Sequence, residues 1–227
     1  MTSTMNLALF DLDHTLLPID SDHTWGAFCI AEGLVDPVEH QQRNDEFAAQ
    51  YRAGTLDIHA YVAFAMRVAA SAGKDRAAHL HQKYMTDWIL PAIRPEALAL
   101  VRSHQERGDT CIIITATNEF VTRAIASAFG VEHLIAVDLE RDADGHVTNR
   151  IAGVPSFKDG KVTRMEMWLA ARGLTWADVP KSTFYSDSIN DLPLLERVTN
   201  PVATNPDDRL RAIALQRQWR ILDLFQS

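Results

Sequence analysis

The sequence of 227 residues predicts an α/β protein: a doubly wound (Rossmann-like), mostly parallel sheet with a four-helix insertion after the first strand. Short, uninterrupted apolar runs such as 7–10 and 110–114 are typical of strands buried on both faces. Such runs alternate with helical patterns only in the later part of the chain. We therefore expect residues 1–16 and 93–227 to form the α/β core and residues 17–92 to form the helical insertion.

After the first strand comes a segment in which every expected element is a helix. Asp36 followed by Pro37 is typical of a helix start, and Gly54 is typical of a helix end. Apolar residues at helical spacing complete the pattern. The four expected helices run through Trp25 and Phe28, from Pro37 to Gly54, from Asp57 to Gly73, and through Leu80, Tyr84 and Trp88.

Beyond Pro95, helices and strands alternate, as expected for parallel strands joined by crossover helices. The expected helices are Glu96–Arg107, Glu119–Phe129, Val162–Arg172 and Leu192–Val198. The expected strands are Thr110–Ile114, Leu134–Val137, Ser182–Tyr185, Pro201–Ala203 and Ile221–Leu224. The pair Asp144-Gly145, between Leu139 and Val147, predicts a β-hairpin.

Composition and charge narrow the range of functions. The chain is 47% hydrophobic, and its 22 Lys+Arg against 30 Asp+Glu give a net charge of −8. Such a chain forms a substantial core but offers no field for holding nucleic acid. It has two cysteines, no signal-peptide pattern, and no segment apolar enough to span a bilayer. We expect a cytoplasmic protein without nucleic-acid or membrane partners, and its oligomeric state stays open.

Polar residues cluster where the predicted buried strands end. They are Asp11 and Asp13 after the first strand, Thr115 and Thr117 after the second, and Ser186, Asp187, Asn190 and Asp191 after a later one. Ligands bind at the carboxyl edge of an open parallel sheet. Carboxylates gathered there repel one another unless a cation neutralises them, and hard oxygen ligands suit Mg²⁺. We therefore expect these acids to form a Mg²⁺ site.

This cluster suits phosphate monoesters, because Mg²⁺ offsets the charge that keeps a phosphate dianion away from a carboxylate. An aspartate can then attack phosphorus to give an aspartyl-phosphate. A second carboxyl group two residues later, as in Asp11 and Asp13, can protonate the leaving oxygen and then deprotonate the hydrolytic water. Thr115, Lys161 and backbone N–H groups are placed to bind the phosphoryl oxygens.

Four sequence motifs of this chain resemble those of the haloacid dehalogenase (HAD) superfamily of phosphohydrolases, and they follow one another in the same order as in that family. The run FDLDHTLL at residues 10–17 resembles the first motif, DxDxT followed by an apolar pair. Thr115, at the end of an Ile-rich strand, looks like the second motif, and Lys161, at the opening of a helix, looks like the third. The run YSDSINDLPLL at residues 185–195 resembles the fourth, with Ser186 in place of its usual glycine.

The resemblance implies a role for each matching residue. Asp11 would be the nucleophile and Asp13 the general acid and base, while Thr115 and Lys161 would bind the phosphoryl group. Mg²⁺ would bind the side chains of Asp11 and Asp187 and the backbone carbonyl of Asp13, with Asn190 and Asp191 in support. Lys158 is the alternative to Lys161 as the phosphate ligand. The helical insertion is similar to the cap of the phosphoserine-phosphatase-like branch (subfamily IB), which can close over the site.

The substrate side departs from phosphoserine phosphatases, which carry a glutamate shortly after the first motif and an arginine on a cap helix. Asp20 or Asp22 can replace the glutamate, but no arginine stands at the expected place. Thr117 and Asn118 replace a glycine-containing loop and can reach a different substrate. We therefore expect a phosphatase for a small phosphorylated metabolite. One alternative is narrow specificity for phosphoserine or histidinol phosphate, and another is an aspartyl-phosphate signalling module without turnover.

Overall fold

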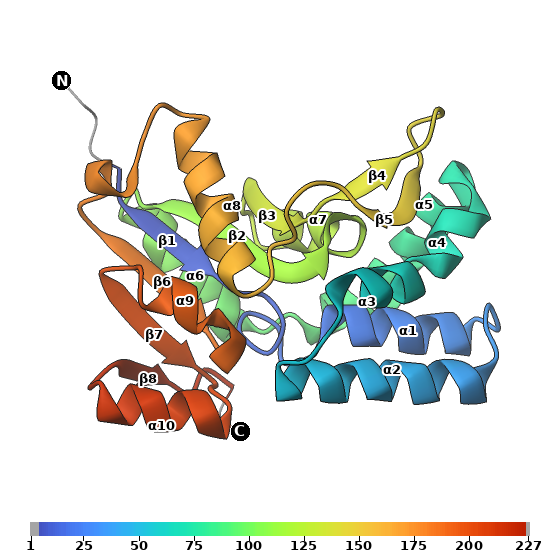
Figure 1. Ribbon diagram of the computed structural model, residues 1–227, viewed down its shortest axis with the longest axis horizontal. Helices are drawn as coiled ribbons and strands as arrows, with labels where there is room; N and C mark the ends of the chain where they lie inside the picture. Colours follow the sequence, from blue (N-terminus) through green and yellow to red (C-terminus); the bar gives the residue numbers. More distant parts are fainter. Residues whose placement is uncertain (1–4, 226–227) are drawn as a thin grey trace.

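A six-stranded, entirely parallel sheet forms the centre of the computed structural model, which describes residues 5–225 (Figure 1). The strands are, in spatial order, β3 (His133–Val137), β2 (Thr110–Asn118), β1 (Leu7–Phe10), β6 (Ser182–Ser186), β7 (Asn200–Thr204) and β8 (Arg220–Leu222). The order runs one way from β1 to β3 and the other way from β6 to β8, which leaves a crevice between the ends of β1 and β6. The predicted doubly wound α/β fold is confirmed. The outermost residues of the expected core, 1–4 and 226–227, lie outside the described part of the chain.

Helices cover both faces of this sheet. Successive side chains of β1 point to opposite faces, so that Ala8 and Phe10 belong to one apolar cluster and Leu7 and Leu9 to the other. Helices α6 (Pro95–Glu106) and α7 (Glu119–Ala128) pack on the first face; α8 (Asp159–Ala170), α9 (Leu192–Leu195) and α10 (Asp208–Gln216) pack on the second. Sequence reasoning missed α10, which begins with Asp207 as its N-cap and buries Leu210 and Ala214.

The insertion is entirely helical, as predicted, but its third helix is divided. It contains α1 (Ser21–Ala31), α2 (Pro37–Ala53), α3 (Ile58–Ala65), α4 (Arg67–Ala72), α5 (Lys74–Tyr84), a π-helical turn (Met85–Ile89) and a 3-10 turn (Leu90–Ala92). The single helix expected between Asp57 and Gly73 breaks at Met66, where no glycine or proline stands. Met66, Val68 and Ala69 are all buried in the apolar core, so tertiary packing sets the break.

Trp25 anchors the interior of the insertion. Its ring packs against Phe28 and Tyr84, and its indole N–H donates to the carbonyl of Ala65 over 3.2 Å. The Tyr84 hydroxyl donates to the carbonyl of Ser21 over 2.6 Å. These contacts tie α1, α3 and α5 together, and their apolar residues join the same cluster as Phe10 of the sheet.

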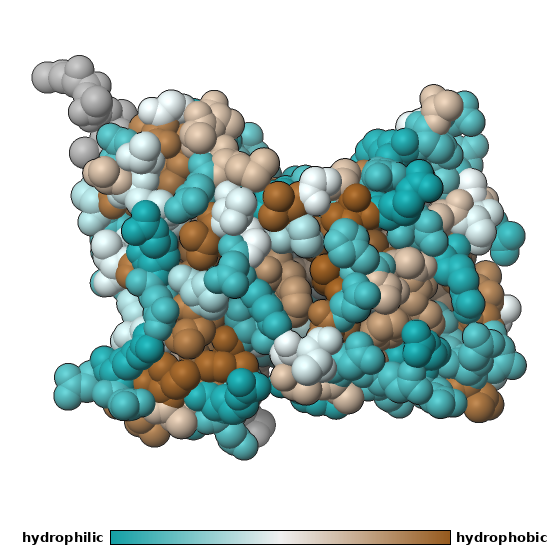
Figure 2. Space-filling model, in the orientation of Figure 1, coloured by the Kyte–Doolittle hydropathy of each residue, from teal (hydrophilic) through white to brown (hydrophobic). Residues whose placement is uncertain are grey.

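The predicted hairpin forms from β4 (Leu139–Arg141) and β5 (Val147–Ile151). It leaves the core and packs against the insertion, where His146 Nε2 lies 2.9 Å from the carbonyl of Ala69 and Asn149 donates to the carbonyl of Ala63 over 3.5 Å. Figure 2 shows this face of the molecule hollowed between the side of α8 and the side of the hairpin. Among residues 5–225 no helix is both long and apolar enough to cross a membrane.

Candidate active site

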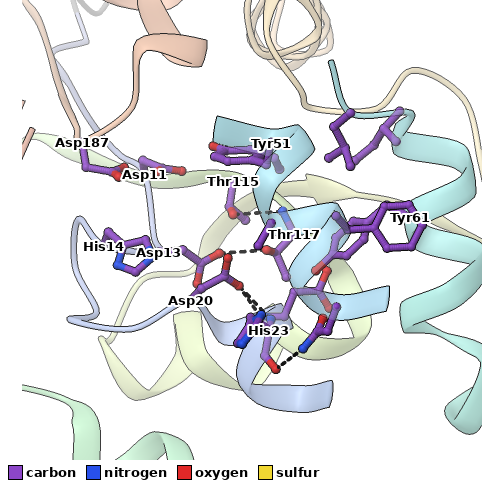
Figure 3. A pocket seen from close by; sticks show the side chains of 17 residues that line it. Asp11, Asp13, His14, Asp20, His23, Tyr51, Tyr61, Thr115, Thr117 and Asp187 are labelled. Atoms are coloured by element: carbon purple, nitrogen blue, oxygen red, sulfur yellow. Dashed lines mark hydrogen bonds between the residues drawn. The ribbon is translucent and has the colours of Figure 1, made fainter. Parts of the chain in front are cut away.

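The predicted acids meet at the carboxyl edge of the sheet. Phe10 pairs in register with Ile113 of β2 and Tyr185 of β6, so the residues that follow these strands reach the same level. Asp11 and Asp13 follow β1, and Asp187 follows β6 beside Asp11 (Figure 3). The second strand is longer than predicted and extends through Thr115 and Thr117 to Asn118.

Lys161 is the cation of this cluster. It is only 1% exposed, and its Nζ donates to Asp11 Oδ1 over 2.8 Å and to Asp191 Oδ2 over 2.7 Å. Burial alone would lower the pKa of Lys161, but the carboxylates of Asp11 and Asp191 outweigh burial and raise it. Lys158, the alternative, turns away and donates to the carbonyl of Gly54 over 2.6 Å. The structure therefore brings Lys161, and not Lys158, to the acids.

The cluster carries more negative charge than Lys161 neutralises. Burial raises the pKa of Asp187 well above its ordinary value, and Asp11 and Asp191 add to this shift by repulsion. Burial also raises the pKa of Asp191, to about 6, although Lys161 counteracts it. Raised carboxylate pKa values mean that these groups resist ionising together, as expected where a cation belongs.

A divalent cation fits the donors gathered here. The side chains of Asp11 and Asp187 lie next to each other, and the Asp13 carbonyl belongs to the same turn (Figure 3). Within residues 5–225 no three His, Cys, Asp or Glu side chains form a complete ligand set. The two neighbouring carboxylates of Asp11 and Asp187, with a carbonyl oxygen and water, are nevertheless a donor set that suits a hard ion such as Mg²⁺.

Asp13 sits at the centre of a hydrogen-bond network that fixes its carboxyl group. Its Oδ1 accepts from the Ser21 backbone N–H over 2.7 Å, and its Oδ2 accepts from the Thr117 hydroxyl over 2.8 Å. Burial, followed by the charge of Asp20, raises the pKa of Asp13 to about 7. A carboxyl group with this pKa can both give and take a proton near neutral pH, as a general acid and base must.

Thr115 is held so that its hydroxyl proton stays free. The Thr115 Oγ1 accepts a hydrogen bond from the Thr117 N–H over 3.1 Å, and the Thr115 carbonyl accepts one from the Ser156 hydroxyl over 2.6 Å. Because Oγ1 acts as an acceptor inside the protein, its own proton is available to an anion in the cavity.

The two acids predicted on the substrate side have different roles in the structure. Asp20 is the N-cap of α1, with Oδ1 accepting from the N–H groups of Asp22 and His23. Asp22 is 3% exposed; its Oδ1 accepts from the Asn118 amide over 3.3 Å, while its Oδ2 has no partner among residues 5–225. Burial, with repulsion from Asp20 and Asp13, raises the pKa of Asp22 well above its ordinary value.

These residues surround an inner cavity of about 50 Å³. Its lining includes the acids Asp11, Asp13, Asp20, Asp22 and Asp187, the aromatic residues Phe47, Tyr51 and Tyr61, and also His14, His23, Asn44, Thr115 and Thr117. Within residues 5–225 no lysine or arginine lines it. The cavity is therefore acidic and partly aromatic.

Sequence reasoning missed the cavity residues on α2 and α3. Asn44, Phe47 and Tyr51 are spaced three and four residues apart, which places them on one face of α2, and Tyr61 on α3 lies beside Asp22. Tyr51 lies above Thr115, with its hydroxyl directed toward Asp11 and Asp187 (Figure 3). The helical spacing was readable in the sequence, but which face of α2 meets the acids was not.

Asn190, predicted to support the metal site, makes a different contact. Its amide donates to the carbonyl of Tyr51 over 2.9 Å, so it binds the end of α2. Asp191 does lie with the acids, where its Oδ2 accepts from Lys161 and from the Ser186 hydroxyl, each over 2.7 Å. Ser186, which replaces the usual glycine of the motif, thus adds a hydrogen bond to the cluster.

Comparison with known proteins gives four findings. A family model described as haloacid dehalogenase-like hydrolase matches residues 8–196. A histidinol-phosphatase of Neisseria meningitidis is 44% identical over 218 residues, which are 96% of this chain and 98% of that protein. A protein of unknown function from Bordetella pertussis is 48% identical with a TM-score of 0.92, covering 98% of this chain and 100% of that one. A substrate-bound phosphoserine phosphatase, 13% identical with a TM-score of 0.67 over 96% of this chain and 93% of that one, shares the fold.

Proposed function

The chain belongs to the haloacid dehalogenase-like hydrolases and is a phosphatase, and on this basis we propose its substrate. The proposed substrate is a small phosphate monoester whose organic group is cationic and aromatic, and histidinol phosphate is our candidate. The observation that carries the proposal is the inner cavity, which is lined by five aspartates and by neither lysine nor arginine.

Charge separates the two candidate substrates. Phosphoserine carries an ammonium and also a carboxylate. The carboxylate would face aspartates, and the described lining residues include no lysine or arginine to receive it. Histidinol phosphate carries an ammonium and an imidazole but no carboxylate, so both of its polar groups suit an acidic wall. Unpaired like charges reject a ligand as effectively as good contacts retain one. The 44% identity to a protein named histidinol-phosphatase supports the same choice.

The recognition of the organic group is assigned to Asp22 and the aromatic residues around it. The unpartnered, buried Oδ2 of Asp22 can accept a hydrogen bond from an N–H of the substrate, which offsets the unfavourable burial of that carboxylate. The rings of Phe47 and Tyr61 line the same cavity and offer faces for an imidazole. Asn118 holds the other oxygen of Asp22 and so fixes its orientation.

Hydrolysis proceeds in two steps. In the first, an Asp11 oxygen attacks phosphorus, the bond from phosphorus to the leaving oxygen breaks, and Asp13 gives that oxygen a proton. In the second, Asp13 takes a proton from a water molecule, whose oxygen attacks phosphorus and releases Asp11. The raised pKa of Asp13, about 7, suits both directions of proton transfer.

The remaining residues stabilise the charge of the phosphoryl group. Lys161 and Thr115 are the donors to its oxygens, and Lys161 stays charged because two carboxylates raise its pKa. The residues that would hold Mg²⁺ are Asp11 and Asp187, through their side chains, and Asp13, through its carbonyl. When bound, Mg²⁺ supplies positive charge that offsets the carboxylates and the substrate dianion. The insertion, residues 17–92, acts as a cap that excludes water.

The test is phosphate release from histidinol phosphate, phosphoserine and an uncharged alkyl phosphate, with Mg²⁺ or EDTA. We expect kcat/KM for histidinol phosphate to exceed that for phosphoserine by about 100-fold or more, since one unpaired charge in a buried site costs several kcal/mol. Asp11→Asn, which keeps the shape and removes the nucleophile, is the control and should abolish release. Equal or faster hydrolysis of phosphoserine would overturn the substrate, and a single stoichiometric phosphorylation without turnover would favour a signalling module.

A further inference from the structure

Three side chains of the core bind the C-terminal end of α2 across its boundary with the insertion. Lys158 donates to the carbonyl of Gly54 over 2.6 Å, Asn190 to that of Tyr51 over 2.9 Å, and Arg209 to that of Arg52 over 3.3 Å. The last carbonyls of a helix generally lack partners within the helix and lie at its negative end, although the Tyr51 carbonyl also accepts from the Gly54 N–H over 3.0 Å. The three donors therefore satisfy this end, and we call them the α2 latch.

The backbone on both sides is shaped for this contact. Gly54 has φ of 71°, and a Cβ added to it would lie 3.5 Å from Asn190 Oδ1 and 3.8 Å from Lys158 Nζ. Lys158 itself has φ of 52°, a left-handed conformation that is unfavourable for a residue with a Cβ. The contacts of the Lys158 side chain offset this strain, since its ammonium reaches Gly54 and lies 5.1 Å from the Phe157 ring centroid.

The latch determines where Tyr51 lies. Asn190 holds the backbone of Tyr51 directly, and the ring of Phe157 packs 5.9 Å from the ring of Tyr51. Tyr51 lines both the inner cavity and an open outer cleft of about 790 Å³, so it stands between them. Its hydroxyl is directed into the site, toward Asp11 and Asp187 (Figure 3).

The inner cavity is small for a phosphate monoester, with a volume of about 50 Å³, and Tyr51 brings the end of α2 to its side. A shift of this end of α2 would enlarge the cavity. The α2 end is bound to the core through three hydrogen bonds and no described ion pair, and such contacts exchange readily with water. Tyr51 would withdraw from the acids if these three contacts opened, because its backbone is held by one of them.

We propose that the Tyr51 hydroxyl donates a hydrogen bond to the phosphoryl group, and that Lys158, Asn190 and Arg209 position it there when the α2 latch closes. The inference rests on the proposed phosphatase site, but it does not depend on the identity of the organic group. Tyr51 then adds to Lys161 and Thr115 a third side-chain donor, which only the closed insertion supplies.

The first test is Tyr51→Phe, which keeps the ring and removes the hydroxyl. We expect kcat/KM for p-nitrophenyl phosphate and the affinity for orthovanadate to fall about 10- to 100-fold, as for loss of a hydrogen bond to a charged group. Tyr185→Phe is the matched control, because it removes a tyrosine hydroxyl that bonds His104 outside the cavity; it should retain vanadate affinity. Calorimetry of vanadate binding reports on Tyr51 even if histidinol phosphate is not a substrate. Unchanged vanadate affinity in Tyr51→Phe overturns the proposal.

The second test asks whether the latch acts through Tyr51. Lys158→Met should weaken vanadate binding about 5- to 10-fold in the wild-type background and much less when Tyr51→Phe is already present, because coupled residues are not additive. Lys158→Gly also removes the hydrogen bond to the Gly54 carbonyl, and glycine adopts a positive φ without strain. This second variant should therefore fold and should show the same loss of vanadate affinity. Lys181→Met, at an exposed lysine far from α2, is the control and should change nothing. Equal losses in both backgrounds would mean that Lys158 does not position Tyr51.

Discussion

Two walls of one cavity face each other, and they are held in place by different means. The strand-end wall consists of Asp11, Asp13, Thr115, Thr117 and Asp187, which lie on or directly after strands of the sheet. The helix-face wall consists of Asn44, Phe47, Tyr51 and Tyr61, which lie on α2 and α3. The first wall is fixed by the register of parallel strands. The second is fixed by packing, by side-chain hydrogen bonds such as that from Asn44 to the His23 carbonyl, and by the α2 latch.

The difference assigns separate tasks to the two walls. Residues bonded into a continuous sheet keep their mutual distances, which is what attack on phosphorus and proton transfer demand. Residues on a helix face can be exchanged or moved without disturbing that geometry, so they suit substrate selection and closure. Substitutions in the strand-end wall should therefore affect every ester, and so should loss of the Tyr51 hydroxyl, which we assign to the phosphoryl group. Substitutions at Phe47 and Tyr61 of the helix-face wall should discriminate among esters.

The largest expected effect is that of Asp13→Asn, in the strand-end wall. We expect kcat/KM for an alkyl ester such as histidinol phosphate to fall about 10³-fold, because the leaving alkoxide is no longer protonated. With p-nitrophenyl phosphate, whose leaving group needs no proton, the first step should survive. The variant should then release one equivalent of p-nitrophenol in a burst and turn over slowly afterwards. Equal losses with both esters and no burst would show that Asp13 is not the acid.

An intermediate effect is expected for Asp22→Asn, where the two walls meet. Replacing the carboxylate should lower kcat/KM for histidinol phosphate about 100-fold, because the charge-assisted contact to the organic group is lost. Turnover of p-nitrophenyl phosphate, which has no cationic group, is the internal control and should change by less than about threefold. A uniform loss with both substrates would place Asp22 in the chemistry and would remove the division between the walls.

The smallest expected effect is on stability, again through Asp22. Its pKa is raised in the folded protein, so the folded state binds its proton more tightly than the unfolded state does. The contribution of the protonated Asp22 to the free energy of unfolding is therefore fully present below about pH 4. It is lost as the pH rises through the raised pKa. Asp22→Asn should be more stable than wild type at pH 8, by about 1–3 kcal/mol, with a smaller gain at pH 5.

Urea unfolding at several pH values measures this difference. Asp36→Asn is the control, because it makes the same chemical change at an exposed N-cap of α2. The control should show only a small change in stability, because asparagine also caps helices well. If the gain in unfolding free energy of Asp22→Asn does not grow with pH, ionisation of the buried Asp22 carboxyl group does not destabilise the protein, and the prediction is wrong.

The strand-end wall was largely predictable from the sequence. An apolar run such as 7–10 indicates a buried strand, and the edge where parallel strands end is common to all of them. Asp11 and Asp187 therefore had to meet, although 175 residues separate them. The choice between Lys158 and Lys161 was not predictable, because both stand near the start of one helix. The structure separates them: the Lys161 side chain reaches the acids and that of Lys158 reaches Gly54.

The helix-face wall was not predictable in the same way. A helical pattern gives the spacing of Phe47 and Tyr51 but not the direction in which α2 crosses the sheet edge. The break at Met66 has the same origin, since no glycine or proline marks it and only burial in the core requires it. Local sequence determines which elements form, whereas contacts between distant segments determine how the insertion lies.

The β4–β5 hairpin limits how freely this architecture can be rebuilt. It belongs to the core by sequence, yet His146 and Asn149 are bonded to main-chain carbonyls of α4 and α3. A chimaera that exchanged only residues 17–92 with a relative would put foreign helices against these two side chains. The part of the chain that such a chimaera must exchange is therefore discontinuous in sequence. It comprises residues 17–92 and the β4–β5 hairpin, which packs against their helices.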